Sequence, residues 1–221
     1  MSPGNIDRAT LEAAELPPYP GIALEHVTLV EDEAAAEAAR ASLLAADAIG
    51  FDSESKPTFT KGEISTGPHL VQLATDNEVW LFRPMHAATL PALKAVLEAP
   101  DVRKIGFGLG NDRSALETRF GIRLVNVLDL GERLRGPGHR GTVGAKMAVA
   151  HFFGQRLQKS KKTGTSNWAT ARLSEAQMRY AANDAHVAIR IYRVWNAGAA
   201  SAVSSGSISA TPPASATGGG T

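Results

Sequence analysis

The sequence predicts one α/β domain in which helices cover a mixed sheet, and three observations lead to this fold class. Short apolar runs of strand length alternate with longer helical segments along the chain. Two strands follow each other across a short polar turn, which makes that pair antiparallel, whereas alternating strands and helices give parallel pairs. The 221 residues suffice for one domain of ordinary size and show no internal repeat.

The first half of the domain supplies a strand pair joined by a tight turn. The expected strands here are residues 26–30, 48–52, 70–74 and 78–82. Asp76 and Asn77 lie between the last two strands and are typical of a hairpin turn. Helices are expected over the alanine-rich residues 34–45 and over residues 90–97.

The second half of the domain alternates strand and helix. Strands are expected at 104–107 and 126–129, and helices at 112–119, 142–153 and 174–195. Ser174, with Gln177 three residues later, has the capping-box pattern that marks a helix start. This order completes a sheet in which parallel and antiparallel neighbours occur together.

Two terminal segments are expected to lie outside the domain, which spans residues 24–196. Residues 1–23 carry several prolines near their end and are expected to form an extended arm. Residues 197–221 are expected to be a disordered tail, because 23 of these 25 residues are Ala, Gly, Ser, Thr or Pro and none is charged.

Composition excludes several classes of protein. The absence of cysteine excludes a disulfide scaffold, a thiolate zinc site, an iron–sulfur cluster and a cysteine nucleophile. No apolar run approaches the roughly 20 residues of a membrane span, and the first residues lack the pattern of a secretory signal. We therefore expect a cytoplasmic or otherwise intracellular protein, nuclear in a eukaryote, with no membrane partner.

The net charge of +1 conceals a strong asymmetry along the chain. Residues 1–54 hold eleven acidic and two basic residues, whereas residues 133–193 hold twelve basic and two acidic ones. A basic C-terminal half is typical of a surface for a polyanion such as nucleic acid, and equally of a solvated charged face. Charge alone leaves both interpretations open.

Four acidic residues stand at positions where they can meet. Asp52 and Glu54 are two residues apart on a strand and therefore share a face. Asp112 begins a helix after a glycine-rich turn, and Asp184 follows Tyr180 by one helical turn. Converging carboxylates repel each other and persist as a cluster only where cations neutralise them. Oxygen ligands favour Mg²⁺ or Mn²⁺, and two such ions form a clamp for attack on a phosphodiester.

These segments resemble the tyrosine branch of the DEDD 3′–5′ exonucleases, which includes ribonuclease D and the Werner syndrome exonuclease domain. The matching motifs are Asp52-Ser53-Glu54, the segment 106–112 that ends in Asp112, and Tyr180-Ala181-Ala182-Asn183-Asp184. The flanks Leu70-Val71-Gln72-Leu73 and Ser166-Asn167-Trp168 agree as well, so the resemblance spans residues 25–195. It implies an RNase H-like α/β fold: a mixed five-stranded sheet with helices on both faces.

The resemblance also implies an activity and a role for each motif residue. The activity is metal-dependent hydrolysis of phosphodiester bonds at the 3′ end of DNA or RNA, releasing nucleoside 5′-monophosphates. Asp52, Glu54 and Asp184 are implied as direct ligands of two Mg²⁺ or Mn²⁺ ions, with Asp52 bridging them. Asp112 would act on the second ion, and Tyr180 would orient the attacking water, because a phenol is a poor base at neutral pH.

Other residues bear on the substrate. Ser55 stands where family members often carry an aromatic residue, which leaves open how the terminal base is held. A basic loop is expected to contact the substrate backbone, with a solvated loop as the alternative; its candidate residues are Arg156, Lys159, Lys161 and Lys162. Trp168 is a candidate for stacking on a base, with packing of the last helix against the sheet as the alternative.

Two other functions compete with the nuclease. One is a non-catalytic nucleic-acid-binding module on the same fold, against which the presence of all five site residues argues. The other is a dinucleotide-binding oxidoreductase, because Gly106-x-Gly108 follows a strand and Asp129 lies about 20 residues on. Its fingerprint is incomplete, since Asn111 replaces the third glycine and Asp112 would repel a pyrophosphate.

Overall fold

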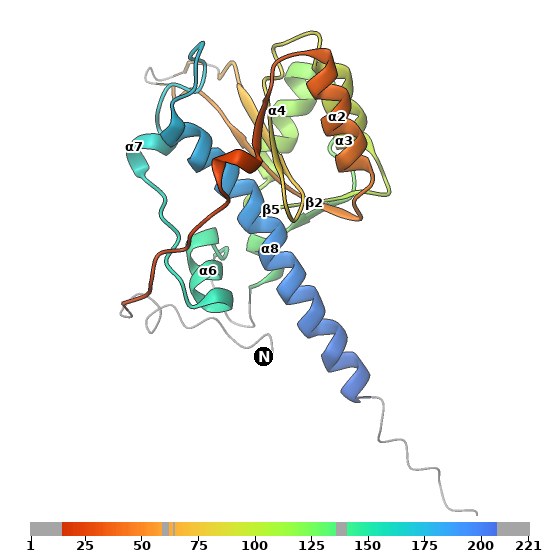
Figure 1. Cartoon of the computed structure of the whole chain (residues 1–221), viewed down its shortest axis with the longest axis vertical. Helices are drawn as coiled ribbons and strands as arrows, with labels where there is room; N and C mark the ends of the chain where they lie inside the picture. The colour runs from red at the N-terminus through yellow and green to blue at the C-terminus, as the bar shows by residue number, and fades with distance from the viewer. Residues whose placement is uncertain (1–14, 59–61, 64, 136–140, 207–221) are drawn as a thin grey trace, which may run out of the picture.

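The fold is built on a six-stranded mixed sheet, seen in a computed structural model that describes residues 15–58, 62–63, 65–135 and 141–206 (Figure 1). The strands are β1 (Val27–Val30), β2 (Ala48–Glu54), β3 (Leu70–Ala74), β4 (Val79–Phe82), β5 (Arg103–Gly106) and β6 (Val127–Asp129). Their order across the sheet is β1-β4-β3-β2-β5-β6.

The expected count of five strands is wrong, because both short edge strands join the sheet. β1 pairs parallel with β4 at one edge, and β6 pairs parallel with β5 at the other. The hairpin is confirmed: β3 and β4 are antiparallel, and the Thr75 N–H donates to the Glu78 carbonyl at 2.9 Å. β2 runs antiparallel to β3 and parallel to β5, so the sheet is mixed as expected.

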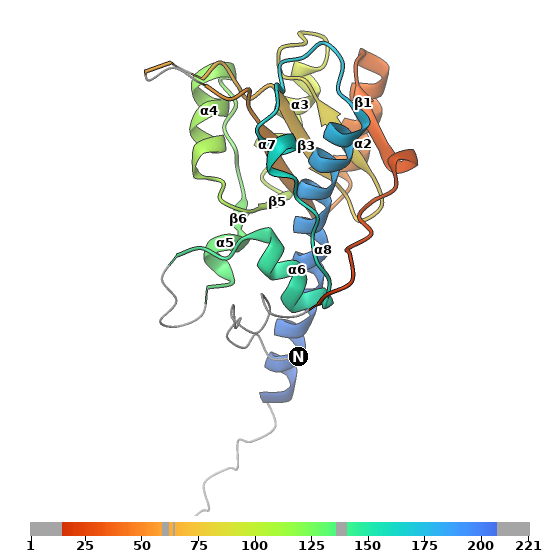
Figure 2. The ribbon, with the colours of Figure 1, turned by 90° about the vertical axis from the view of Figure 1, so that its left-hand side faces the viewer.

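Helices pack on both faces of this sheet. They are α2 (Glu33–Leu44), α3 (Leu90–Glu98), α4 (Gly110–Phe120), α5 (Leu130–Arg133), α6 (Ala145–Phe153), α7 (Lys161–Gly164) and α8 (Glu175–Gly206), preceded by a 3₁₀ turn at Leu24–His26. The single-turn helices α5 and α7 were not expected, because four residues are too few to show helical periodicity. Figure 2 shows α7 beside the N-terminal half of α8.

The two faces of the sheet form two separate apolar layers. One layer lies under α8 and α6 and includes Leu70 and Leu81. The other lies under α2 and α3 and includes Val71, Leu73 and Phe82. Because successive strand residues point to opposite faces, β3 contributes to both layers.

The last helix, α8, begins at the predicted capping box and continues beyond its predicted end. The Gln177 N–H donates to the Ser174 hydroxyl at 3.2 Å, and the Ser174 N–H donates to the Gln177 side chain at 3.0 Å. The helix then runs to Gly206 and projects past the other elements (Figure 1). The expectation of a disordered tail therefore does not hold for residues 197–206, where alanines continue the helix. The rest of that tail, residues 207–221, lies outside the described residues.

The N-terminal arm follows the domain surface where it is described, and residues 1–14 of it lie outside the described residues. Pro18 forms a parallel bridge with Arg156, and the Tyr19 ring stacks on Phe153 at 5.8 Å between centroids. The Ile22 N–H donates to the Asn183 side chain at 2.9 Å. Within the described ranges, no helix is both long enough and apolar enough to cross a membrane.

Candidate active site

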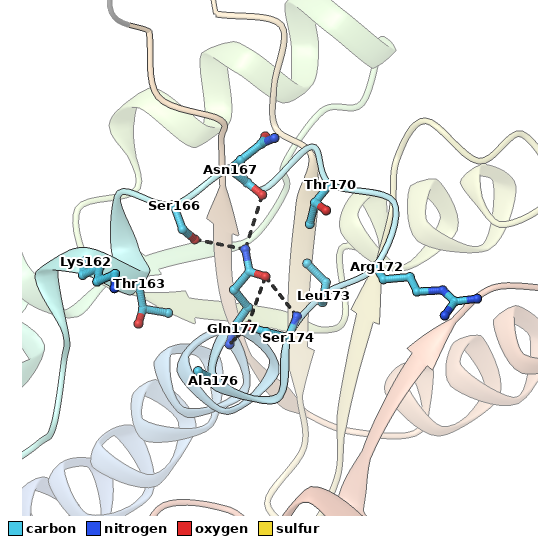
Figure 3. Close-up of a pocket in the computed structure, with 10 residues that line it drawn as sticks. All are labelled: Lys162, Thr163, Ser166, Asn167, Thr170, Arg172, Leu173, Ser174, Ala176 and Gln177. Carbon is cyan, nitrogen blue, oxygen red and sulfur yellow. Dashed lines mark hydrogen bonds between the residues drawn. The ribbon is translucent and has the colours of Figure 1, made fainter.

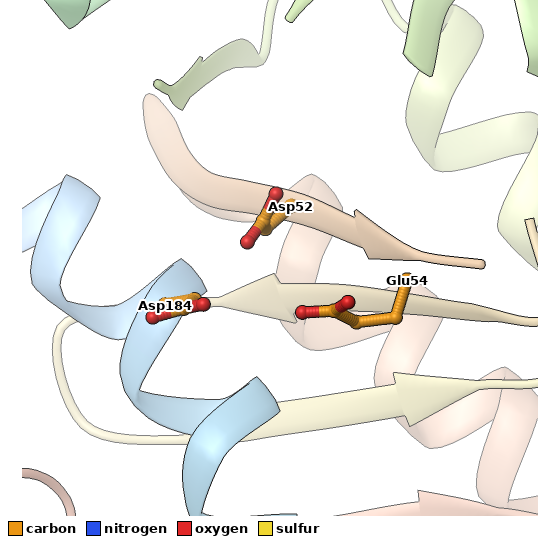
Figure 4. Close-up of side chains that lie close together, drawn as sticks. All are labelled: Asp52, Glu54 and Asp184. Atoms are coloured by element: carbon orange, nitrogen blue, oxygen red, sulfur yellow. The ribbon is translucent and has the colours of Figure 1, made fainter. Parts of the chain in front are cut away.

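Three of the predicted carboxylates converge between β2 and α8. Asp52 and Glu54 lie at the end of β2, and Asp184 reaches them from α8 (Figure 4). One oxygen from each lies within 4.8 Å of those of the other two. An all-carboxylate donor set of this kind suits a hard divalent cation, so these residues could hold a metal ion.

A glycine brings the strand and the helix close enough for this convergence. Gly50 lies on β2 two residues before Asp52, where β2 passes α8. A Cβ atom at this position would lie 1.9 Å from the carbonyl oxygen of Ala185, which follows Asp184. The absence of a side chain at Gly50 therefore sets the distance between the two halves of the cluster.

Burial and mutual repulsion both oppose ionisation of the cluster. Burial, followed by the charges of Asp184, Glu54 and Asp112, raises the pKa of Asp52 well above its ordinary value. Burial and the charge of Asp184 raise the pKa of Glu54 to about 8. Burial also raises the pKa of Asp184, against the opposing effect of Lys159. Such a site gains most from a bound cation, because metal ligands must be deprotonated.

Asp112 lies in the first turn of α4 and outside the three-carboxylate cluster. The Ser53 hydroxyl, from the residue between Asp52 and Glu54, donates to the Asp112 carboxylate. Burial raises the pKa of Asp112. The negative charge of Asp112 in turn contributes to the raised pKa of Asp52. The structure thus places Asp112 beside the cluster, with Ser53 as the link that the sequence analysis did not identify.

Tyr180 lies one helical turn from Asp184 and is enclosed by α7. A Cβ on Gly164 would lie 2.6 Å from the Tyr180 hydroxyl, so that hydroxyl faces the α7 backbone. The Trp168 ring packs against the Tyr180 ring at 5.9 Å between centroids. Burial and the charge of Asp184 raise the pKa of Tyr180 to about 12, so the phenol keeps its proton at neutral pH.

Comparison with known proteins decides the family. A model of the 3′–5′ exonuclease family matches residues 27–194, which include every residue of the site. This chain belongs to the 3′–5′ exonuclease family. Membership of this family supports a nuclease, that is, a hydrolase, and gives no support to the oxidoreductase alternative.

Curated relatives of this exonuclease are much longer than the chain. It is 30% identical over 152 residues to the bifunctional 3′–5′ exonuclease/ATP-dependent helicase WRN of Mus musculus, covering 66% of this chain and 11% of that protein. It is 32% identical over 192 residues to the exonuclease mut-7 homolog of Aedes aegypti, covering 76% of this chain and 26% of that protein. The shared part is therefore the nuclease domain.

Solved structures of similar fold agree. The Nibbler EXO domain of Aedes aegypti superposes with a TM-score of 0.68 at 28% identity, covering 82% of this chain and 92% of that one. RNase D of Escherichia coli superposes with a TM-score of 0.67 at 22% identity, covering 80% of this chain and 46% of that one. The fold of this exonuclease is thus RNase H-like, as the sequence motifs implied.

The glycine turn before α4 has two of its backbone amides occupied by a carboxylate of the protein itself. The Gly108 and Leu109 N–H groups donate to the two carboxylate oxygens of Asp129, at 3.1 and 2.9 Å. The Gly131 N–H donates to the same carboxylate at 2.8 Å. Asp129 therefore fixes the turn that carries Asp112, which is a different role from the ribose contact of a dinucleotide site.

The basic loop divides into one inward-facing and three exposed cations. Lys159 extends into the site, where its Nζ lies 2.7 Å from Asp184 Oδ2. Arg156 is exposed and pairs through its backbone with the arm, and Lys161 and Lys162 are exposed on α7. Exposed cations beside the site remain candidates for substrate contact, whereas Lys159 has a carboxylate partner that the sequence did not predict.

Trp168 packs inside the protein, so the prediction that it stacks on a base is wrong. Its side chain is 1% exposed, and its Nε1–H donates to the Gly164 carbonyl at 3.2 Å. The alternative interpretation, packing of the last helix, is the one that the structure supports. Trp168 contacts the candidate site through the Tyr180 ring and contacts α7 through the Gly164 carbonyl.

An open pocket of about 700 Å³ lies at the N-terminal end of α8, one helical turn before Tyr180 (Figure 3). The buried Gln177 lies in its wall and donates to the Ser166 hydroxyl at 3.0 Å and to the Asn167 carbonyl at 3.3 Å. Lys162 and Arg172 also line it. The Ser-Asn-Trp segment thus lies between α7 and the start of α8, the helix that carries Tyr180 and Asp184.

Gln72 is a buried amide beside the cluster, and its sequence context did not mark it as a residue of the site. It lies opposite Asp52 in the β2–β3 register and therefore shares its face. Its residue is 0% exposed, and neither side-chain polar atom has a hydrogen-bond partner among the described residues. Only the strand register identifies it as a neighbour of the site.

Proposed function

We propose that this exonuclease removes single nucleotides from the 3′ end of DNA or RNA and releases nucleoside 5′-monophosphates, using two Mg²⁺ or Mn²⁺ ions. The observation that carries this proposal is the convergence of Asp52, Glu54 and Asp184 within 4.8 Å. Neighbouring, partly buried carboxylates repel one another when ionised, so bound cations would stabilise their ionised form. The family membership supplies the reaction class.

The metal-binding residues are proposed to be Asp52, Glu54, Asp184 and Asp112. Bound divalent ions would supply Lewis-acid activation of water and neutralisation of phosphate charge. Asp52 and Glu54 hold their donor atoms on one strand, and Gly50 fixes the approach of Asp184. Ser53 holds Asp112 against the same strand, within reach of the cluster.

Tyr180 is proposed to orient the attacking water. Its pKa of about 12 keeps the hydroxyl protonated, so it acts as a hydrogen-bonding group and not as the base. The enclosing α7 and the packed Trp168 ring fix its direction. The proton on the water would pass to bulk solvent or to a carboxylate of the site.

Nucleic acid would be bound by the exposed cations around the site. Lys161 and Lys162 lie on α7, beside Tyr180, and Arg172 lies across the pocket from Lys162. RNase D of Trypanosoma brucei, which is 20% identical with a TM-score of 0.67, has been solved in complex with RNA.

The decisive experiment digests matched DNA and RNA oligonucleotides, single-stranded and recessed, with the full chain. Mg²⁺ or Mn²⁺ should support stepwise shortening from the 3′ end with mononucleotide products, whereas Ca²⁺ should support little turnover because its coordination is looser. Excess chelator should abolish the reaction. Full activity in chelator would overturn the metal-dependent mechanism, and products longer than mononucleotides would overturn the exonucleolytic one.

A further inference from the structure

Lys159 is the one described cation that ion-pairs with the carboxylate cluster. Its Nζ lies 2.7 Å from Asp184 Oδ2 and 5.2 Å from the centroid of the Tyr180 ring. The side chains are 27% and 4% exposed for Lys159 and Asp184, respectively, so water screens the pair poorly. Lys161 and Lys162, its neighbours in the basic loop, are both exposed.

The backbone on both sides of Lys159 directs it into the site. Leu157, two residues before, is buried in the apolar layer under α8. Ser160, directly after it, caps α7 by accepting a hydrogen bond from the Thr163 N–H. The placement of the ammonium is therefore part of the fold and not the chance contact of a surface side chain.

The charge of this ammonium acts on the whole cluster. It opposes the rise of the pKa of Asp184 and also that of Asp52 and of Glu54. Burial acts to lower the pKa of Lys159 itself, but Asp184 raises it overall, so the side chain stays charged. The protein thus carries one positive charge where the proposed function places metal ions.

We propose that Lys159 is the resident counter-ion of Asp184 in the metal-free enzyme, and that a divalent cation entering the site displaces its ammonium from that carboxylate. This inference rests on the proposed function. A metal ion bound to Asp184 would lie within a few ångströms of the ammonium, and two cations so close repel strongly in a poorly screened site. The flexible four-carbon stem of lysine permits the movement, and the Tyr180 ring offers the displaced ammonium a second partner.

Lysine-selective ¹⁵N NMR tests the displacement directly. A buried, paired ammonium exchanges its protons slowly, so metal-free enzyme in chelator should show a resolved Lys159 Nζ signal that is absent in Lys159→Met. Saturating Mg²⁺, without substrate, should shift or broaden this signal. Lys104, on β5, is an internal control, because its Nζ is held by the carbonyls of Ala99 and Val102, at 2.7 and 2.8 Å, and not by a carboxylate of the site.

Thermal melts separate the counter-ion role from ordinary packing. In chelator, Lys159→Met should melt roughly 4 °C or more below wild type, because the buried Asp184 loses its partner. With saturating Mg²⁺ the difference should shrink to about 1 °C or less, since the metal ion replaces that partner. Lys161→Met, a matched change on the exposed side, should melt like wild type in both conditions.

The outcomes distinguish this inference from the proposed function. Calorimetric titration with Mg²⁺ reports binding independently of Lys159. No binding at all would contradict the proposed metal site. Binding that leaves the Lys159 signal in place, or an equal loss of melting temperature with and without Mg²⁺, would overturn the counter-ion role and leave the metal site intact.

Discussion

The two faces of the sheet differ in what they bury. The face under α2 and α3 is apolar along β2 and β3, with Phe51 and Leu73 fully buried there. The face under α8 receives the next residues of the same strands, Asp52 and Gln72, as well as Asp184 from the helix. One strand pair therefore stabilises the fold on one face and builds the site on the other, because side chains alternate along a strand.

Each face also contains one inward-pointing lysine, and the two are held differently. Lys104 is fully buried and donates to two carbonyl oxygens, and burial lowers its pKa to about 8. Lys159 has a carboxylate partner, which raises its pKa instead. A buried lysine paired only with carbonyls is disfavoured in its charged form, whereas one paired with a carboxylate is favoured in it.

Asp52→Asn should have the largest effect on activity among changes to the sheet face under α8. The amide keeps the shape of the side chain but removes a charge that the proposed metal site needs, so hydrolysis should fall at least about a hundredfold. In chelator the variant should unfold at the wild-type temperature or above, because one repelling carboxylate is gone. Exonuclease assays and melts on one preparation give both results, and wild-type digestion would show that Asp52 is not in the site.

Tyr180→Phe removes one hydroxyl from the same face. If that hydroxyl aligns the attacking water, kcat should drop by roughly ten- to a thousandfold while KM changes little. Metal affinity should stay near wild type, because the phenol is not a ligand. Steady-state kinetics with calorimetric metal titration measure this, and a normal kcat with a lowered melting temperature would make Tyr180 a packing residue.

Leu73→Ala probes the opposite face of β3, one residue from Gln72. Cavity formation under α2 and α3 should lower the free energy of unfolding by about 2–5 kcal/mol. At a temperature where the variant remains folded, kcat should be close to wild type, since Leu73 points away from the site. Urea unfolding and kinetics together check this separation, and a large loss of kcat in the folded variant would break it.

Lys104→Met tests how the buried lysine makes the free energy of unfolding depend on pH. The pKa of Lys104 is about 8 in the folded state and has its ordinary value of 10.5 in the unfolded state, so the folded protein loses the ammonium proton first as pH rises. Between these values the unfolded state binds more protons, so wild-type stability should rise with pH by up to about 1.4 kcal/mol per unit. The Met variant lacks this contribution. Urea unfolding of both proteins at about pH 7 and pH 9.5 measures the difference, and parallel pH profiles would contradict it.

Periodicity and motif spacing predicted most of the architecture and the chemistry of the site. The hairpin and the capped start of α8 follow from local patterns. The convergence of Asp184 with Asp52 and Glu54 was implied by the resemblance to the DEDD exonucleases, and the structure brings these three carboxylates together. Tyr180 was selected because it shares a helix face with Asp184, and its proposed role came from the resemblance.

Long-range contacts were beyond these local patterns. Gln72 looks like one polar residue in an apolar strand until the register places it opposite Asp52. Lys159 looks like one of several lysines in a basic loop until the fold turns it toward Asp184. Trp168 was left with two interpretations for the same reason, since its burial depends on how α7 packs and not on its neighbours in sequence.

Gly50 shows that a site can depend on a residue that contributes no functional group. An added methyl group would overlap the Ala185 carbonyl and push α8 away from β2, which would separate Asp184 from Asp52 while every carboxylate remained in the chain. A comparison of motif residues alone would not detect the defect in such a variant, because Asp52, Glu54 and Asp184 would all be present. The spacing between the β2 and α8 backbones is therefore encoded in the sequence at Gly50, as the carboxylates are encoded at their own positions.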